Sequence, residues 1–214
     1  MVSSLVDSHP TTFATVWVHL QDGYQTSWGD QRFFNFYGET TIPNMWLDGV
    51  SNPDTNYGQY AASLNQRLGL GTDVTIDLTG IETGTQQFDV RARVCVEPDG
   101  VEKTMRVYMV HALDHWPVAP TWYRNCVRQT VSTADVTVAP GTCEDVTRTF
   151  TFDATSWLNQ GDIRIVAWAQ VPSSSGPAEV YQAAQMSWPF PLPEEVFASD
   201  FEDGTTDDWS TVVP

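Results

Sequence analysis

Apolar residues in the first 70 positions come in blocks that suit alternating strands and helices. A continuous apolar and β-branched run over residues 13–20 predicts a strand that is covered on both faces. Apolar side chains at helical spacing predict helices over residues 30–37 and 57–68, and a short strand is expected between them at 42–47. A strand–helix–strand–helix order is typical of an α/β domain.

The pattern changes to a period of two after Gly71. Apolar and polar residues then alternate along seven short segments separated by turn residues. Two of these segments are expected to form a hairpin about Ala139–Thr142. Seven short strands with regular turns predict an antiparallel β-sandwich of immunoglobulin-like type. The predicted strands are residues 74–79, 88–96, 103–113, 135–138, 145–152, 163–170 and 179–188.

The chain therefore divides into three parts. Residues 1–70 are predicted to form a partial α/β domain, residues 71–190 the sandwich, and residues 191–214 an acidic, extended tail. The expected fold class is α+β with two domains. The tail opens in a proline-rich stretch and continues with Asp and Glu beside two aromatic residues, which suits a segment that lies on a surface.

The chain is strongly acidic. Its 214 residues carry a formal charge of −17, with 27 Asp and Glu against 10 Lys and Arg. Such a surface repels phosphate backbones and anionic lipid, so nucleic acid and membrane-surface partners are disfavoured. No apolar run reaches transmembrane length, and no signal peptide is visible at the start. Acidic turns at Asp54 and Glu97–Gly100 could bind calcium, but none matches an EF-hand loop, and solvated turns are the preferred interpretation.

Scattered positions over residues 1–190 resemble one known family. The similar segments are residues 13–19, 32–37, 42–49, 107–110, 163–170 and 179–184. They are similar to the outer-membrane-protein-28-related family of secreted bacterial proteins. The resemblance implies a secreted, periplasmic or surface-attached protein in which a thioredoxin-like domain precedes an immunoglobulin-like sandwich.

Pro43 gains a specific interpretation from this resemblance. It follows the helix predicted over 30–37 and opens the strand predicted over 42–47. Proline is tolerated at the first residue of a strand, and the X-Pro peptide is the one for which the cis form costs little. In thioredoxin-like proteins a proline in this arrangement lies beside the active site, so Pro43 is a candidate cis-proline. An ordinary turn proline is the alternative.

The sequence departs from the family at its N-terminus. A thioredoxin-like domain opens with a strand and a C-x-x-C at the start of its first helix, where the helix N-terminus lowers the thiol pKa. Here Met1 is expected where that helix should be finishing, and the chain contains no C-x-x-C. Half of a thioredoxin sheet would leave an open strand edge, which invites another chain to pair with it. We therefore expect self-association or a protein partner at residues 13–20, through Phe13, Val16 and Val18.

Three cysteines allow one disulfide and one free thiol. In an immunoglobulin-like order, the strand that contains Cys95 pairs antiparallel with the strand that begins just after Cys143. Both cysteines also have the outward parity of their strands. This favours a Cys95–Cys143 bridge, while Cys126–Cys143 remains the rival pairing if residues 116–132 loop back.

His111, Asp114 and His115 have side chains of the kinds that bind metals. On a strand, however, residues four apart are separated by about 13 Å. They converge only if the strand ends and turns before Trp116, so polar residues at a strand end are the preferred interpretation. His19, at the end of a predicted buried strand, is interpreted as a core histidine. No cofactor is expected.

Three functional hypotheses follow. The leading one is a non-catalytic structural or interaction module outside the cytoplasm, such as a subunit of a cell-surface assembly, because no catalytic constellation is encoded. The second is the remainder of a secreted thiol–disulfide oxidoreductase whose C-x-x-C lies upstream of Met1. The third is a calcium- or carbohydrate-binding surface module, which acidic loops and aromatic residues would serve.

Overall fold

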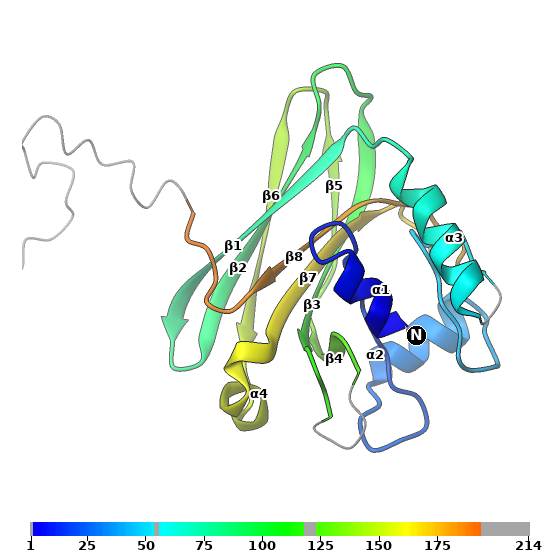
Figure 1. Cartoon of the computed structure of the whole chain (residues 1–214). Helices are drawn as coiled ribbons and strands as arrows, with labels where there is room; N and C mark the ends of the chain where they lie inside the picture. The colour runs from blue at the N-terminus through cyan, green and yellow to red at the C-terminus, as the bar shows by residue number, and fades with distance from the viewer. Residues whose placement is uncertain (1, 54–55, 118–122, 194–214) are drawn as a thin grey trace, which may run out of the picture.

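Two antiparallel sheets packed face to face form most of the molecule. The computed structural model of the chain describes residues 2–53, 56–117 and 123–193. The helices and extended chain of the N-terminal part lie to one side of the sheets (Figure 1). The fold is thus mostly antiparallel β-sheet with a few short helices. Within the described ranges, no helix is long and apolar enough to cross a membrane.

The smaller sheet has three strands in the order β1–β2–β6. They are β1 (Val74–Gly84), β2 (Gln87–Val96) and β6 (Cys143–Thr151). Every second residue of β2, from Phe88 to Val96, is buried. A period of two is what a strand with one covered face requires, and the sequence prediction of these strands is confirmed.

The larger sheet has five strands and is built around β3 (Lys103–Leu113). One edge of β3 pairs with β7 (Ile163–Gln170), which pairs in turn with β8 (Val180–Ser187). Its other edge is shared by two short strands, β4 (Cys126–Thr130) and β5 (Ala134–Val138). The sequence pattern predicted four of these strands and missed β4.

The predicted hairpin about Ala139–Thr142 is wrong. β5 pairs with β3 in the larger sheet, whereas β6 pairs with β2 in the smaller one. The Ala139–Thr142 turn is present, since the Thr142 N–H donates to the Ala139 carbonyl at 3.1 Å, but it carries the chain from one sheet to the other. After β6, a short helix α4 (Ala154–Leu158) and a 3-10 turn (Gln160–Asp162) return it to β7.

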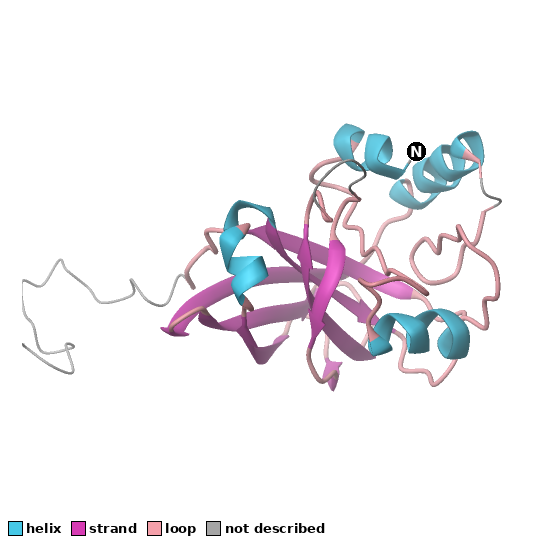
Figure 2. Ribbon diagram, turned by 90° about the horizontal axis from the view of Figure 1, so that it is seen from below, coloured by secondary structure: helices cyan, strands magenta, loops and turns pink. Residues whose placement is uncertain are grey.

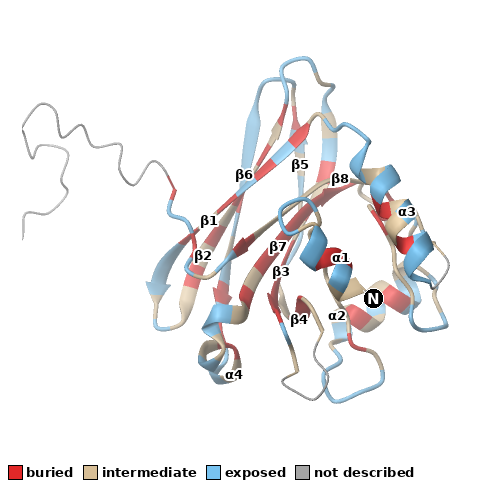
Figure 3. Ribbon diagram, in the orientation of Figure 1, coloured by how far each residue is buried: buried red, intermediate tan, exposed pale blue. Residues whose placement is uncertain are grey.

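The main core lies between the two sheets (Figure 3). Aromatic rings fill one end of it: the Phe88 ring lies 5.6 Å from that of Phe152 and 5.1 Å from that of Trp188. Burial of one such side chain contributes about 1.5–3 kcal/mol, so this core dominates the stability of the fold.

The described residues between 2 and 70, called the N-terminal layer below, lie against the outer face of the larger sheet (Figure 2). Their helices are α1 (Val2–Ser8), α2 (Ser27–Asp30), a π-helix (Gln31–Phe36) that continues α2, and α3 (Tyr57–Leu68). On the sheet side the contact consists of outward-facing residues of β3, β4 and β7. These residues are Val110, Val127, Val166 and Trp168, and the layer covers them with Ala14, Val16, Val18 and Trp28.

Helix α3 has the bounds that the sequence predicted. The Asn56 side chain caps it by accepting a hydrogen bond from the Gln59 N–H at 3.0 Å. Tyr60 and Leu64, one turn apart, are buried, and the helix ends before Gly69. The helix predicted over 30–37 begins earlier, at Ser27, and is π-helical in its second part.

Both strands predicted in the N-terminal layer are absent. Residues 13–20 form an extended segment with one β-bridge, at Trp17, and residues 42–47 have one bridge, between Leu47 and Ser51. The apolar run at 13–20 is explained by packing flat on the larger sheet instead of pairing inside a sheet. At 42–47 the chain turns back at once, because Asp48 and Gly49 both have positive φ, 45° and 71°.

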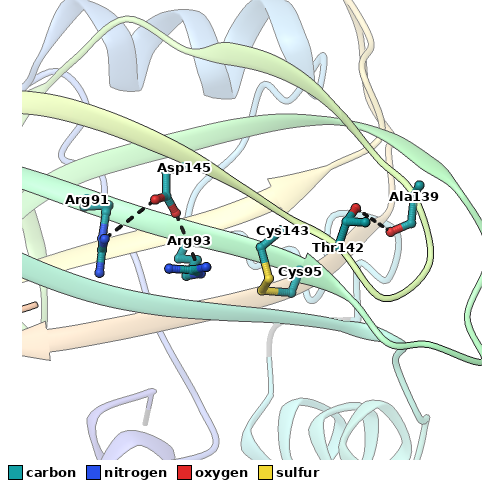
Figure 4. The surroundings of a disulfide bond; sticks show 7 residues. All are labelled: Arg91, Arg93, Cys95, Ala139, Thr142, Cys143 and Asp145. Carbon is teal, nitrogen blue, oxygen red and sulfur yellow. Dashed lines mark hydrogen bonds and ion pairs between the residues drawn. A yellow bond between two sulfur atoms is a disulfide. The ribbon is translucent and has the colours of Figure 1, made fainter. Parts of the chain in front are cut away.

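Cys95 and Cys143 lie opposite each other in the β2–β6 register and form a disulfide (Figure 4). Asp145 on the same face pairs with Arg91 and Arg93 of β2, at 3.6 and 4.0 Å. The bridge joins residues 48 positions apart, a loop length for which the chain-entropy model gives roughly 4 kcal/mol of stabilisation. The third cysteine, Cys126, is free and buried.

Backbone hydrogen bonds join the N-terminal layer to the segment that enters β8. The Ala178 and Val180 N–H groups donate to the carbonyls of Gly49 and Asp48, at 3.1 and 2.8 Å. A Cβ atom at Gly49 would overlap the Ala178 carbonyl oxygen and lie 2.9 Å from Nε2 of Gln170. Only glycine therefore fits at this junction.

Replacing Gly49 with alanine is expected to lower the free energy of unfolding by about 2–4 kcal/mol, because the new methyl group must displace the Ala178 backbone. Gly38→Ala is the matched control: Gly38 has a similar φ of 69°, but nothing lies within 4 Å of a Cβ built there. The control should cost only about 1 kcal/mol, the penalty of left-handed backbone. Urea unfolding measures both. Equal losses would mean that the junction is not tightly packed.

Candidate functional site

A pocket of about 220 Å³ opens where the N-terminal layer meets the larger sheet. One face of the α2 helix and its π-helical continuation lines it with residues three and four positions apart, and β3 closes the opposite side. The lining residues are Trp28, Gln31, Arg32, Asn35, Phe36, Tyr108 and Ser174. We call this the Arg32 pocket.

The guanidinium of Arg32 is stacked among aromatic rings. Its central carbon lies 3.9 Å from the ring centre of Phe36 and 5.0 Å from those of Tyr37 and Tyr108. The Nη2 group donates to Oε1 of Gln170 at 2.6 Å and to the Tyr37 hydroxyl at 3.2 Å. Cation–π contacts of this kind each contribute about 0.5–2 kcal/mol, so the side chain is held in one orientation.

Gln170 links the two sides of the site. It is fully buried at the end of β7, on the face that the N-terminal layer covers. Its Nε2 donates to the Ala178 carbonyl at 2.7 Å, while Oε1 accepts from Arg32 and, at 3.4 Å, from the Trp168 indole. Burial raises the pKa of the neighbouring Tyr37 hydroxyl, which therefore stays neutral.

This arrangement suits binding. The pocket presents a fixed positive charge, aromatic walls and two exposed amide side chains, those of Gln31 and Asn35. Pockets of this composition hold small ligands in a set orientation. Neither Arg32 nor Gln170 was found from the sequence. Arg32 lay inside a predicted amphipathic helix, and 138 positions separate it from Gln170.

A second cluster brings together a thiol, an imidazole and a carboxylate. The Cys126 sulfur lies 3.4 Å from Nε2 of His19, and Nδ1 of His19 lies 2.7 Å from Oδ2 of Asp22. His19 is buried, as the sequence suggested for a core histidine, and its ring contacts those of Tyr24 and Tyr123 edge-on.

The thiol of this cluster is protected rather than activated. Cys126 has no exposed surface, and its sulfur donates to the Trp116 carbonyl at 3.0 Å. Burial, reinforced by the charges of Asp114 and Asp22, raises the pKa of the Cys126 thiol to about 12. A nucleophilic cysteine needs the opposite shift, because the thiolate is the reactive form.

The three metal candidates do not come together at one point, although His115 lies beside Asp114, with 3.5 Å between Nδ1 and Oδ2. His111 lies inside the sandwich core with its ring 4.7 Å from that of Phe152, and burial lowers its pKa to about 3. Asp114 instead accepts hydrogen bonds from Arg124, at 2.5 and 2.9 Å. Burial raises the pKa of Asp114, but the Arg124 guanidinium outweighs this and holds it below the usual value. No group of three or more ligating side chains suited to a metal occurs among the described residues.

The remaining predicted residues lie in the N-terminal layer. The Ile42–Pro43 peptide is cis, in a loop rather than at a strand start, and Ile42 is 63% exposed. Phe13 packs on a small cluster formed with α1 and α3, whereas Val16 and Val18 face the larger sheet. The open strand edge expected there is not formed, and self-association through these residues stays a prediction.

Comparison with models of protein families and with curated proteins finds no match. Among solved structures, the chain is similar to HBP35 of Porphyromonas gingivalis, with a TM-score of 0.64 and 13% identity over 93% of this chain and 67% of that one. A domain of the outer membrane lipoprotein Omp28 from the same bacterium matches 57% of this chain and 92% of its own length, with a TM-score of 0.42 and 15% identity. At these identities the likeness to HBP35 is one of fold.

The burial of His111 predicts an acid-sensitive fold. Its pKa is about 3 in the folded protein and near 6.5 in the unfolded chain, so below pH 6.5 the unfolded chain binds the extra proton. The stabilisation is complete above pH 6.5 and is lost as the pH falls. Between pH 6 and 5 the free energy of unfolding should fall by about 1.2 kcal/mol through this group.

Urea unfolding of His111→Gln at several pH values checks this prediction. In this variant the free energy of unfolding should no longer show the fall with pH that comes from residue 111. The control His9→Gln, just after α1, should show the same fall as the wild type. A His111→Gln variant with the wild-type slope would show that another group is responsible.

Proposed function

We propose that the chain is a non-catalytic interaction module that works outside the cytoplasm. In this proposal residues 1–70 are a thioredoxin-like remnant, residues 71–190 are an immunoglobulin-like sandwich, and the protein is a subunit of a surface assembly. The state of the three cysteines supports the proposal most directly.

Two of the cysteines point to an oxidising compartment. The Cys95–Cys143 disulfide lies on the outer face of the smaller sheet, where Cys143 is exposed. Disulfides persist in secreted and periplasmic proteins and are rare where cellular thiols keep cysteines reduced. The acidic surface, with its charge of −17, suits the same location.

The third cysteine supports a non-catalytic role. Thiol–disulfide exchange needs an accessible thiolate. Cys126 is enclosed by Trp116 and His19, and its pKa is raised. In this proposal the chain therefore acts by binding a partner through its surface. The contact predicted at Phe13, Val16 and Val18 belongs to the same proposal.

Thiol titration tests the non-catalytic role. The native protein should react slowly with 5,5′-dithiobis(2-nitrobenzoate), the denatured protein should release one thiol per chain, and Cys126→Ala should release none. The native protein should reduce insulin no faster than the Cys126→Ala variant does. Fast labelling of the native protein together with insulin reduction would overturn the role.

The location is tested on protein from its native source. Cells quenched with acid and digested without reductant should yield the Cys95–Cys143 peptide pair. Two free thiols at these positions would contradict an oxidising compartment. Sedimentation velocity of the same material reports whether the chain self-associates.

A further inference from the structure

We propose that the Arg32 pocket binds a sugar ring that carries one carboxylate, a hexuronate. This goes beyond the interaction module proposed above and rests on different residues, so either can fail without the other. Three observations carry it: the unpaired charge of Arg32, its fixed orientation, and the chemistry of the pocket walls.

Arg32 is a cation without an acidic partner in a chain that has an excess of acids. Among the described residues, Lys103 and all arginines except two have an Asp or Glu oxygen within 4.0 Å. The two exceptions are Arg32 and Arg148. Arg148 donates to the backbone carbonyls of Ser132, Thr133 and Thr147, so its donors are used in the fold.

The donors of Arg32 are only partly used. Within the described ranges, both of its hydrogen bonds leave from Nη2, toward Gln170 and Tyr37. Nε and Nη1 are therefore available, on different edges of a guanidinium that lines a pocket. Either of them can donate one charge-assisted hydrogen bond to a carboxylate, and stacking on Phe36 at 3.9 Å fixes the plane of the guanidinium before a ligand arrives. Such preorganisation lowers the entropy cost of binding.

The pocket walls favour a ring with hydroxyl groups. Trp28 and Tyr108 both contact Trp168, with ring centres 6.1 and 4.9 Å away, so both are held rigidly. Aromatic faces pack against the C–H face of a sugar ring, and the amides of Gln31 and Asn35 can donate to and accept from hydroxyl groups. A volume of about 220 Å³ suits one monosaccharide.

The charge of the protein limits the ligand to a single negative charge. A formal charge of −17 repels a phosphorylated or polyanionic ligand more strongly than a monoanion. One guanidinium likewise neutralises one carboxylate. A hexuronate satisfies the size, the ring, the hydroxyl groups and the charge together.

Isothermal titration with D-glucuronate tests the proposal. The matched probes are D-glucuronamide, in which an uncharged amide replaces the carboxylate; D-glucose, in which a hydroxymethyl group replaces it; and acetate, which has the carboxylate but no ring. Glucuronate should bind at least about tenfold more tightly than each of them, because the neutral probes lose the charge-assisted hydrogen bond and acetate loses the ring contacts. Equal binding of glucose or of acetate would overturn the proposal, as would no saturable binding of glucuronate by folded protein.

Two variants locate the site. Arg32→Gln should weaken glucuronate binding at least about tenfold, and Arg148→Gln, the other arginine without an acidic partner, should leave it unchanged. Because Arg32 also supports Gln170, Asn35→Asp is the second variant. It places a carboxylate beside Arg32 on an exposed residue of the π-helix, so the fold should persist while binding weakens severalfold. Wild-type affinity in both folded variants would rule out the pocket.

Discussion

The hydrogen bonds of one buried amide fix the N-terminal layer on the sandwich. Gln170 is enclosed completely, and leaving a buried polar group without partners costs about 1–3 kcal/mol. Its oxygen accepts from Arg32 of the N-terminal layer, and its nitrogen donates to Ala178 in the segment that Gly49 contacts. The amide is satisfied only when both elements are in place. The position of Arg32, and with it the pocket, therefore depends on Gln170.

The same constraint explains what the sequence could and could not predict. Apart from β4, the strands of the sandwich carry a local period of two and helix α3 carries one of 3.6, and these elements form where predicted. Residues 13–20 carry a strand-like apolar run because the larger sheet buries them, which depends on a surface formed by residues about 100 positions later. Both faces of β7, at residues 163–170, are buried in the structure. A strand buried on both faces needs a second layer that covers the outer face of the sheet.

The candidate sites show a similar division. Cys95 and Cys143 lie on paired strands, so strand order and parity were enough to favour their bridge. His111 and Asp114 are close in sequence, but His111 faces the core from β3, whereas Asp114 lies in the turn after the strand and accepts hydrogen bonds from Arg124. Residue spacing could not predict the whole Arg32 pocket, since its parts come from a helix and from residues far away in the sequence. Spacing indicated only the helical side, where polar and aromatic residues repeat at 28, 31, 32, 35 and 36.

Native-state hydrogen exchange tests most directly whether the N-terminal layer and the sandwich open together. The amides of Ala178 and Val180 donate to carbonyls of the layer, whereas that of Ala167 lies in the centre of β7. If Gln170 joins the two parts into one unit, the three amides exchange with the same opening free energy, equal to that of global unfolding. Exchange of Ala178 and Val180 through a much smaller opening, while Ala167 stays protected, would contradict this account.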